Sequence, residues 1–233
     1  MSYRSPDQRA ITPQHRGRFP GYDVLDQRAH WDDVTTGVVL ARLSTSTDLS
    51  FFSAEEDGIA SALFDLLLAQ DREPRVPLVA LVDARLAAGE TDGWHYDDMP
   101  PDPEAWRRTL AFLDADAREQ TGQPFALLTR EQQAPLVQAV NDAERWHGLP
   151  GKQVWSLWTR YACAAFYSHP WAWNEIGFGG PAYPRGYKNK GLDSRERWEV
   201  PDRDPADPVP FAQRVERAHL NHADLVGRAP DAS

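Results

Sequence analysis

The glycine spacing in the stretch GFGGPA suggests nucleotide chemistry first. Gly177, Gly179 and Ala182 fit the pattern G-x-G-x-x-A, whose glycines let a backbone approach a pyrophosphate. That fingerprint follows a strand and opens a helix, whereas this stretch follows a predicted helix and contains Pro181 and Pro184, which block a helix after it. The spacing therefore favours a sharply turning backbone that packs close to a flat surface.

The histidines are the next candidates for chemistry. His219 and His222 lie three positions apart on a predicted helix, with Asp224 nearby, which fits part of a metal site. Two histidines on a polar helix are more often solvated, and no His-Glu-x-x-His motif accompanies them. His169 precedes a proline at a predicted helix end, where its ring can bond to the last helical carbonyls. A structural role for His169 is favoured over a catalytic one.

Other catalytic patterns are incomplete. The paired acids Asp32–Asp33, Glu55–Glu56 and Asp97–Asp98 are adjacent in sequence, so their side chains point apart on a helix or strand. The chain has no Gly-x-Ser-x-Gly elbow. The one cysteine, Cys163, lies within a predicted amphipathic helix and can form no intramolecular disulfide. These residues do not compose a full active site.

Charge and hydropathy narrow the classes of partner. The 233 residues carry a formal net charge of −10, which disfavours sequence-independent binding to nucleic acid. The most apolar runs are short and each is interrupted by an aspartate, so no membrane span is predicted. No apolar segment follows the arginines of the N-terminal stretch, so we expect no secretory signal and a cytoplasmic location.

The stretch from 166 to 191 combines aromatic residues, glycines and prolines, and it is predicted as a long irregular loop. Among its rings are those of Trp171, Trp173, Phe178, Tyr183 and Tyr187. One loop cannot bury all of them. Either they pack on the chain's own helices, or some form a surface that anchors a protein partner, as Trp and Tyr do at interfaces.

Helical elements must position these residues. Capping boxes at Ser53 with Glu56 and at Thr129 with Gln132 start two helices, the second of which runs to about residue 145. Apolar residues at helical spacing predict further helices over 77–89, 102–119 and 152–168. The predicted inward face of the last of these is Val154, Leu157, Trp158, Tyr161 and Phe166.

The remaining segments are predicted to be less regular. Residues 1–48 read as an extended N-terminal arm, of which residues 1–33 have little core of their own and residues 35–43 form a short strand. Residues 49–200 form the helical domain, and residues 201–233 comprise a proline-rich linker, a helix over about 211–224 and a polar tail. The predicted fold is mainly α, an irregular bundle of about five or six helices with a long Gly/Pro/aromatic loop and extended termini.

Four segments resemble the small subunit of bacterial gluconate 2-dehydrogenase, the subunit 3 family. They are FFSAEEDGIASALFDLLL, VPLVALVDARLAAG, LTREQQAPLVQAV and HPWAWNEIGFGGPAYPRGY. The resemblance covers roughly residues 49–190. It implies a small subunit without a redox cofactor, which accompanies a large FAD-dependent flavoprotein of the glucose–methanol–choline type that oxidises gluconate or another sugar or polyol.

The resemblance also implies a role in folding, export or stability of the large subunit, and in some systems a haem subunit joins the complex. Many members of the family carry a twin-arginine export signal, where this chain has a polar arm. A cytoplasmic complex is therefore the expectation.

The residues expected to bind the partner lie in the aromatic loop. They are His169, Trp171, Trp173, Asn174, Glu175, Gly177, Gly179, Gly180, Tyr183, Arg185 and Tyr187. Two other functions stay open. One is an independent metal-assisted enzyme that uses His169, Glu175 and the C-terminal histidines, and the other is a generic helical interaction module.

Overall fold

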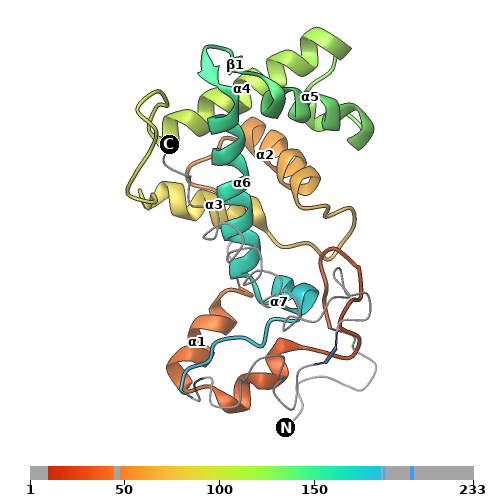
Figure 1. Ribbon diagram of the computed structural model, residues 1–233, viewed down its shortest axis with the longest axis vertical. Helices are drawn as coiled ribbons and strands as arrows, with labels where there is room; N and C mark the ends of the chain where they lie inside the picture. The colour runs from red at the N-terminus through yellow and green to blue at the C-terminus, as the bar shows by residue number, and fades with distance from the viewer. Residues whose placement is uncertain (1–9, 45–47, 185, 187–199, 202–233) are drawn as a thin grey trace, which may run out of the picture.

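Figure 1 shows the computed structural model, which describes residues 10–44, 48–184, 186 and 200–201. The described part is mainly helical, as predicted, with one small antiparallel sheet. Its elements are η1 (Val24–His30), α1 (Asp33–Ala41), α2 (Ala54–Leu67), α3 (Leu78–Ala87), α4 (Asp102–Thr121), η2 (Phe125–Leu127), α5 (Arg130–Asp142), β1 (Arg145–Trp146), β2 (Leu149–Pro150), α6 (Gly151–Ser168) and α7 (Pro170–Ile176).

All five helices expected from capping and periodicity are present, as α2 to α6. Both capping boxes form. Ser53 accepts from the Glu56 amide at 3.2 Å while the Glu56 carboxylate accepts from the Ser53 amide at 2.8 Å, and Thr129 and Gln132 repeat the arrangement at α5. Each box satisfies two amides that the first helical turn leaves unpaired.

The five helices α2 to α6 share one apolar core, in which α6 contacts α2, α3, α4 and α5. Aromatic rings link its layers: Trp106 meets both Phe64 and Tyr161 edge to face, at 5.5 and 5.7 Å between ring centroids. The predicted inward face of α6 is confirmed, since Val154, Leu157, Trp158, Tyr161 and Phe166 are all buried. We call residues 48–168 the bundle.

A tight hairpin joins α5 to α6. Arg145 pairs with Pro150 and Trp146 pairs with Leu149, and the two turn residues, His147 and Gly148, both have positive φ angles of 47° and 82°. Two residues of positive φ match the twist of the strands they connect. The hairpin thereby places the buried Trp146 against Trp158 of α6.

The predicted strand at 35–43 is wrong, because residues 33–41 form the helix α1. The physical reason is an N-cap: the Asp32 carboxylate accepts a hydrogen bond from the Thr35 amide at 2.7 Å, which satisfies an amide of the first turn. Residues 24–30 form the 3-10 helix η1, so this part of the predicted arm is helical rather than extended.

A second apolar cluster lies apart from the bundle core, at the lower end of Figure 1 beside α1 and α7. It consists of Tyr22, Val24, Trp31, Val39 and Trp173, with Phe19, Leu25 and Val200 packed against it. The expectation that the N-terminal segment has little core is therefore also wrong. We call residues 10–44 together with residues 169–184 the N-terminal lobe.

The predicted proline-rich linker and C-terminal helix lie almost wholly outside the described residues, and the predicted domain boundaries stay predictions. Within the part of the chain that the structure describes, no helix is long and apolar enough to cross a membrane.

Candidate functional site

The predicted irregular loop contains a helix, α7, at its start. His169 is the N-cap: its Nδ1 accepts a hydrogen bond from the Trp171 amide at 3.2 Å. The ring therefore caps the following helix, and it is the backbone amide of His169, rather than its ring, that bonds a carbonyl of the preceding helix, that of Phe166 at 3.0 Å. Pro170 occupies the first helical position, where its missing N–H costs nothing, and Gly177 ends the helix at a φ of 68°.

The imidazole of His169 is held neutral. It is buried, and burial together with the nearby Arg42 guanidinium lowers the pKa of His169 to about 4. A neutral ring keeps Nδ1 free to accept from the helix amide, whereas a protonated ring has no acceptor. The geometry gives His169 a capping role.

Asn174 fastens α7 to the N-terminal segment. Its Oδ1 accepts from the Val24 amide at 2.8 Å, and its Nδ2 donates to the Ile11 carbonyl at 3.1 Å and to the Asp23 carboxylate at 3.3 Å. The side chain is 1% exposed. The amide of Asn174 thus satisfies a buried donor and a buried acceptor on a segment distant in sequence.

Glu175 makes a second attachment one residue later. Its two carboxylate oxygens accept from the amides of Gln14 and Arg16, at 2.9 and 3.1 Å. The Gln14 side chain continues the link by donating to the carbonyl of Leu68, at the end of α2. Glu175 is 2% exposed, so both predicted site residues face the chain's own N-terminal segment.

The predicted close approach of the loop glycines to flat groups is confirmed, and the flat groups belong to the same chain. A Cβ on Gly177 would lie 2.5 Å from the ring of Phe19, and a Cβ on Gly180 would lie 2.6 Å from the ring of Trp31. Gly179 between them is buried. No side chain larger than hydrogen fits at Gly177 or Gly180 without displacing a ring.

The two tryptophans of α7 also pack on their own chain. Trp173 belongs to the second cluster, donates from Nε1 to the Tyr167 carbonyl at 2.7 Å and lies under the Arg42 guanidinium. Trp171 is half-buried, packs against the bundle core and meets the His169 ring edge to face at 4.8 Å. Of the two alternatives for the aromatic residues, packing on the chain's own helices holds for these two.

The remaining residues of the predicted partner-binding set are either exposed or outside the described part of the chain. Tyr183 is 66% exposed, and two neighbours that the prediction did not include, Ile176 and Phe178, are exposed as well. Arg185 and Tyr187 lie outside the described residues.

Helix α1 supplies an exposed apolar surface that the sequence analysis missed. Val34, Val38 and Leu40 are exposed, and the signal that would have found the helix is the Asp32 N-cap before an apolar run. Of the ten large hydrophobic side chains exposed among the described residues, six lie in the N-terminal lobe: Val34, Val38, Leu40, Ile176, Phe178 and Tyr183. Exposed apolar surface therefore concentrates on the smaller region.

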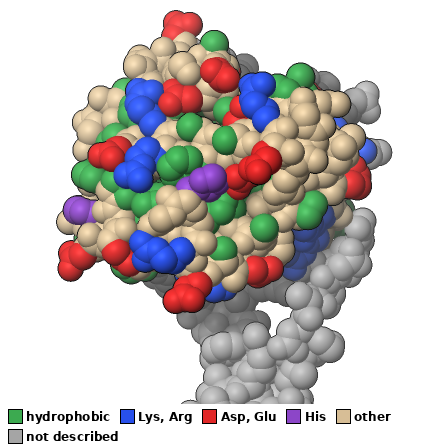
Figure 2. Space-filling view, turned by 90° about the horizontal axis from the view of Figure 1, so that it is seen from above, with side chains coloured by type: hydrophobic (Ala, Val, Ile, Leu, Met, Phe, Trp, Pro, Cys, Tyr) green, Lys and Arg blue, Asp and Glu red, His purple; other side chains and the backbone are tan. Residues whose placement is uncertain are grey.

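The opposite end of the molecule has a different surface. Figure 2 looks down on the end that carries α4, α5 and the hairpin, and acidic, basic and apolar side chains are interspersed over that face. Such a mixed surface is typical of a solvated protein face.

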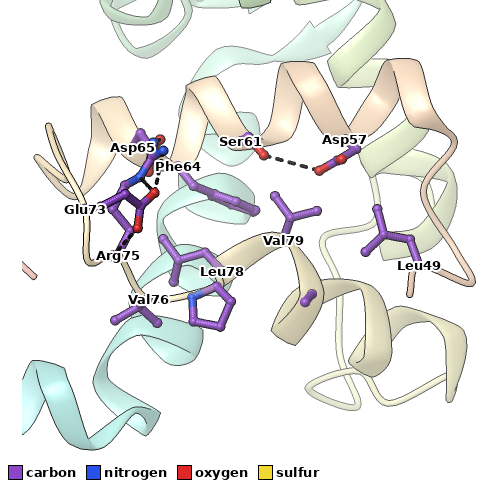
Figure 3. A pocket seen from close by; sticks show the side chains of 12 residues that line it. Leu49, Asp57, Ser61, Phe64, Asp65, Glu73, Arg75, Val76, Leu78 and Val79 are labelled. Carbon is purple, nitrogen blue, oxygen red and sulfur yellow. Dashed lines mark hydrogen bonds and ion pairs between the residues drawn. The ribbon is translucent and has the colours of Figure 1, made fainter. Parts of the chain in front are cut away.

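A groove of about 380 Å³ lies between α2 and the start of α3 (Figure 3). Phe64, Val76, Leu78 and Val79 form its apolar floor. At one rim Ser61 donates to Asp57 at 3.2 Å, and the other rim holds a group of three charged residues.

In that group, Arg75 pairs with both Asp65 and Glu73. Burial raises the pKa of Asp65, against the opposing effect of Arg75. Because each carboxylate on the rim already has a hydrogen-bond partner, the groove is an apolar slot edged by hydrogen-bonded charged residues rather than an acid/base pair.

The predicted metal-assisted alternative gains no support from the described residues. Among them, no three His, Cys, Asp or Glu side chains form a group that could hold a metal ion. His169 and Glu175 bond to backbone amides, and His219 and His222 lie outside the described part.

Comparison with known proteins gives one match. A family model described as gluconate 2-dehydrogenase subunit 3 matches residues 54–180. No curated protein and no solved structure matches the chain. The matched stretch begins with α2 and ends at Gly180, so it includes the bundle helices and α7 and leaves residues 10–44 outside.

Proposed function

The chain belongs to the gluconate 2-dehydrogenase subunit 3 family, and on that premise we propose that it is a non-catalytic accessory subunit of a flavin-dependent dehydrogenase. In this proposal it binds and stabilises a large subunit of the glucose–methanol–choline type that oxidises gluconate or another sugar or polyol. The observation that carries the proposal is the family match, because it covers the bundle helices and the aromatic segment together.

The proposal places the chemistry on the partner. FAD is held by the large subunit, and this chain carries no redox cofactor. The arrangement of its own residues is consistent with that division, since His169 caps α7 and the side chains of Asn174 and Glu175 accept hydrogen bonds from backbone amides.

The distribution of exposed apolar side chains supports a docking role for the N-terminal lobe. The exposed side chains of Ile176, Phe178 and Tyr183, and those on α1, offer apolar and aromatic contact area, and aromatic residues are enriched at the centres of interfaces. We expect the outward residues of the predicted loop, rather than its buried ones, to touch the partner.

Purification from the native cell tests the proposal. A tagged form of the full chain is expected to bring down a large protein in near-stoichiometric amount, with a visible flavin absorption band and dehydrogenase activity toward a sugar or polyol. A chain that purifies alone under mild conditions, or that oxidises such a substrate by itself, would show that the proposal is wrong.

A single substitution tests the loop's part in that complex. Tyr183→Ala should weaken the complex by about 2 kcal/mol, or roughly thirtyfold in affinity, if the ring is an anchor. Leu127→Ala is the matched control, because Leu127 is 72% exposed but lies in the bundle. Equal affinities for the two variants would remove Tyr183 from the interface and leave the accessory role itself untouched.

A further inference from the structure

The loop that joins α3 to α4 carries two of the exposed aromatic side chains of the bundle. It comprises residues 88–101 and lies at the side of the bundle, away from the N-terminal lobe (Figure 1). Trp94 is 49% exposed and Tyr96 is 42% exposed. Their rings meet at 90° with centroids 5.3 Å apart, so the two aromatic surfaces form a corner that solvent reaches.

The loop is fixed to the bundle on both sides of the aromatic pair. Before it, Asp92 forms ion pairs with Arg85 of α3 and with Arg160 of α6. After it, Met99 is buried, and its amide donates to the Tyr96 carbonyl at 3.0 Å. The corner is therefore held in place before any partner binds, which lowers the entropy cost of binding.

Trp94 already stacks on one cation of its own chain. The Arg160 guanidinium lies 5.0 Å from the centroid of the Trp94 ring and 5.3 Å from that of Tyr161. Tyr161 is buried and donates to the Asp102 carboxylate at 2.7 Å, so the stack is anchored in the core. The contact shows that the Trp94 ring takes a guanidinium, and the exposed half of this side chain offers the same chemistry to a cation from outside.

The charges around the aromatic pair are acidic. Residues 86–106 contain six Asp or Glu residues and no Lys or Arg. Three of the six, Glu90, Asp97 and Asp98, are exposed and make no ion pair with another described residue. Asp97 and Asp98 are the two central residues of the turn that is closed by the hydrogen bond to the Tyr96 carbonyl, so both residues are held next to the aromatic pair.

We infer that Trp94, Tyr96, Asp97 and Asp98, which we call the acidic-aromatic surface, bind a basic segment of another protein through its lysine or arginine side chains. One cationic group of the segment lies in the aromatic corner, and the carboxylates pair with its neighbours. The surface belongs to the bundle and not to the lobe, so the inference goes beyond the proposed function and does not depend on it.

Charge complementarity decides among the classes of partner. Nucleic acids and anionic membranes carry the same sign as these carboxylates and are repelled. A second copy of this chain brings a formal net charge of −10, which opposes association. Among the described residues, no group of three His, Cys, Asp or Glu side chains could hold a metal ion. A segment with several lysine or arginine side chains matches both the rings and the unpaired carboxylates.

The test titrates the full chain into a capped, dye-labelled peptide of alternating glycine and arginine, and follows fluorescence polarisation. A salt concentration of about 0.15 M screens attraction over long distances. The control peptide has citrulline in place of arginine, which keeps the shape of the side chain and removes its charge. We expect the arginine peptide to bind, and the citrulline peptide to bind at least about tenfold more weakly.

Two substitutions test whether the peptide binds at this surface, with the fold of each variant checked by circular dichroism. Trp94→Leu removes the ring and should weaken binding of the arginine peptide by about fivefold. Its control is Tyr167→Leu, because Tyr167 is 44% exposed on α6 of the same bundle. Asp97→Asn should weaken binding by about threefold. Its control is Glu119→Gln, which removes one exposed charge from α4. Both controls should behave as the parent.

Three results would overturn the inference. If the arginine peptide binds no more tightly than the citrulline peptide, the surface does not recognise basic side chains. If Trp94→Leu and Asp97→Asn fold and bind the arginine peptide as the parent does, the peptide binds elsewhere. If the parent associates with itself and Trp94→Leu abolishes that association, the occupant is a second copy. None of these results bears on the accessory role, which purification from the native cell tests separately.

Discussion

The bundle and the N-terminal lobe are held together in different ways. In the bundle, long helices bury continuous apolar stripes, and the largest fully buried side chains include Trp106, Trp158 and Phe125. In the lobe, only five buried hydrophobic residues form the cluster. The lobe depends in addition on the buried side chains Asn174 and Glu175, whose bonds cross from α7 to residues 11–24.

The two regions also differ in where they place their apolar surface. The bundle encloses its apolar surface and is stabilised by the removal of that surface from water. The lobe leaves much of its apolar surface outside, on α1 and on the segment after α7. A region that is held in place by a few buried hydrogen bonds can present apolar residues outward, because its own folding does not need to bury them.

The largest effect is expected in the bundle. Trp158 is fully buried, meets Trp146 edge to face and donates from Nε1 to the Thr109 hydroxyl at 3.1 Å. Trp158→Ala should lower the free energy of unfolding by about 3–5 kcal/mol, as deletion of a buried large aromatic side chain does. Urea denaturation measures it, with the exposed Leu127→Ala as control. A loss below about 1 kcal/mol would contradict the assignment of the core.

A pH effect is expected in the lobe. Burial and Arg42 lower the pKa of His169 from 6.5 to about 4. Below about pH 6.5 the unfolded chain gains a proton that the folded chain does not, so stability falls as the pH drops from about 6.5 to about 4. The total loss is about 3 kcal/mol.

His169→Asn isolates this effect, because asparagine also caps helices and does not titrate. As the pH falls from 7 to 4, the unfolding free energy of the variant should rise relative to that of the parent, because only the parent loses stability through this histidine. A difference that is constant over this range would show that His169 does not titrate as described.

The substitution Glu175→Gln tests whether the contacts of Glu175 with the N-terminal segment can be lost while the bundle stays folded. The carboxylate accepts from two amides, and a glutamine places an NH₂ group against one of them, which should cost about 1.5–3 kcal/mol. Hydrogen exchange at Gln14 and Arg16 should accelerate at least about tenfold while the bundle amides stay protected. Glu104→Gln, at an exposed position of α4, is the control. Loss of protection across the whole chain would mean that the two regions unfold as one.

Two glycines of equal φ give the smallest expected difference. Gly180 in the lobe and Gly122 at the end of α4 both have a φ of 76°. An alanine at either position carries the same backbone strain, but only at Gly180 does the new methyl meet Trp31 and Val24. Gly180→Ala should therefore be about 1–3 kcal/mol more destabilising than Gly122→Ala. Equal costs would show that the close approach to Trp31 is absent.

The sequence predicted the bundle well for a physical reason. Capping boxes and apolar residues at helical spacing are local signals, and they located α2 to α6 and the buried face that includes Trp158 and Tyr161. The aromatic segment was also recognised as the distinctive part of the chain, and the family match includes most of it.

The lobe could not be predicted in the same way, because its contacts are not local. Gln14 and Glu175 are separated by 161 positions, and Val24 and Asn174 by 150. No periodicity in the sequence encodes such pairs, so Asn174 and Glu175 looked free to meet a partner. The β-branched residues of α1 suggested a strand, and the local cap from Asp32 outweighed that preference.

Hydrogen exchange of the chain with and without the proposed dehydrogenase subunit tests most directly the proposal that the lobe, and not the bundle, is the docking region. The account predicts that binding slows exchange in α1 and in residues 176–184, and leaves the amides of α4 and α5 unchanged. Protection that appears over α4 and α5, with none in α1 or in residues 176–184, would contradict it.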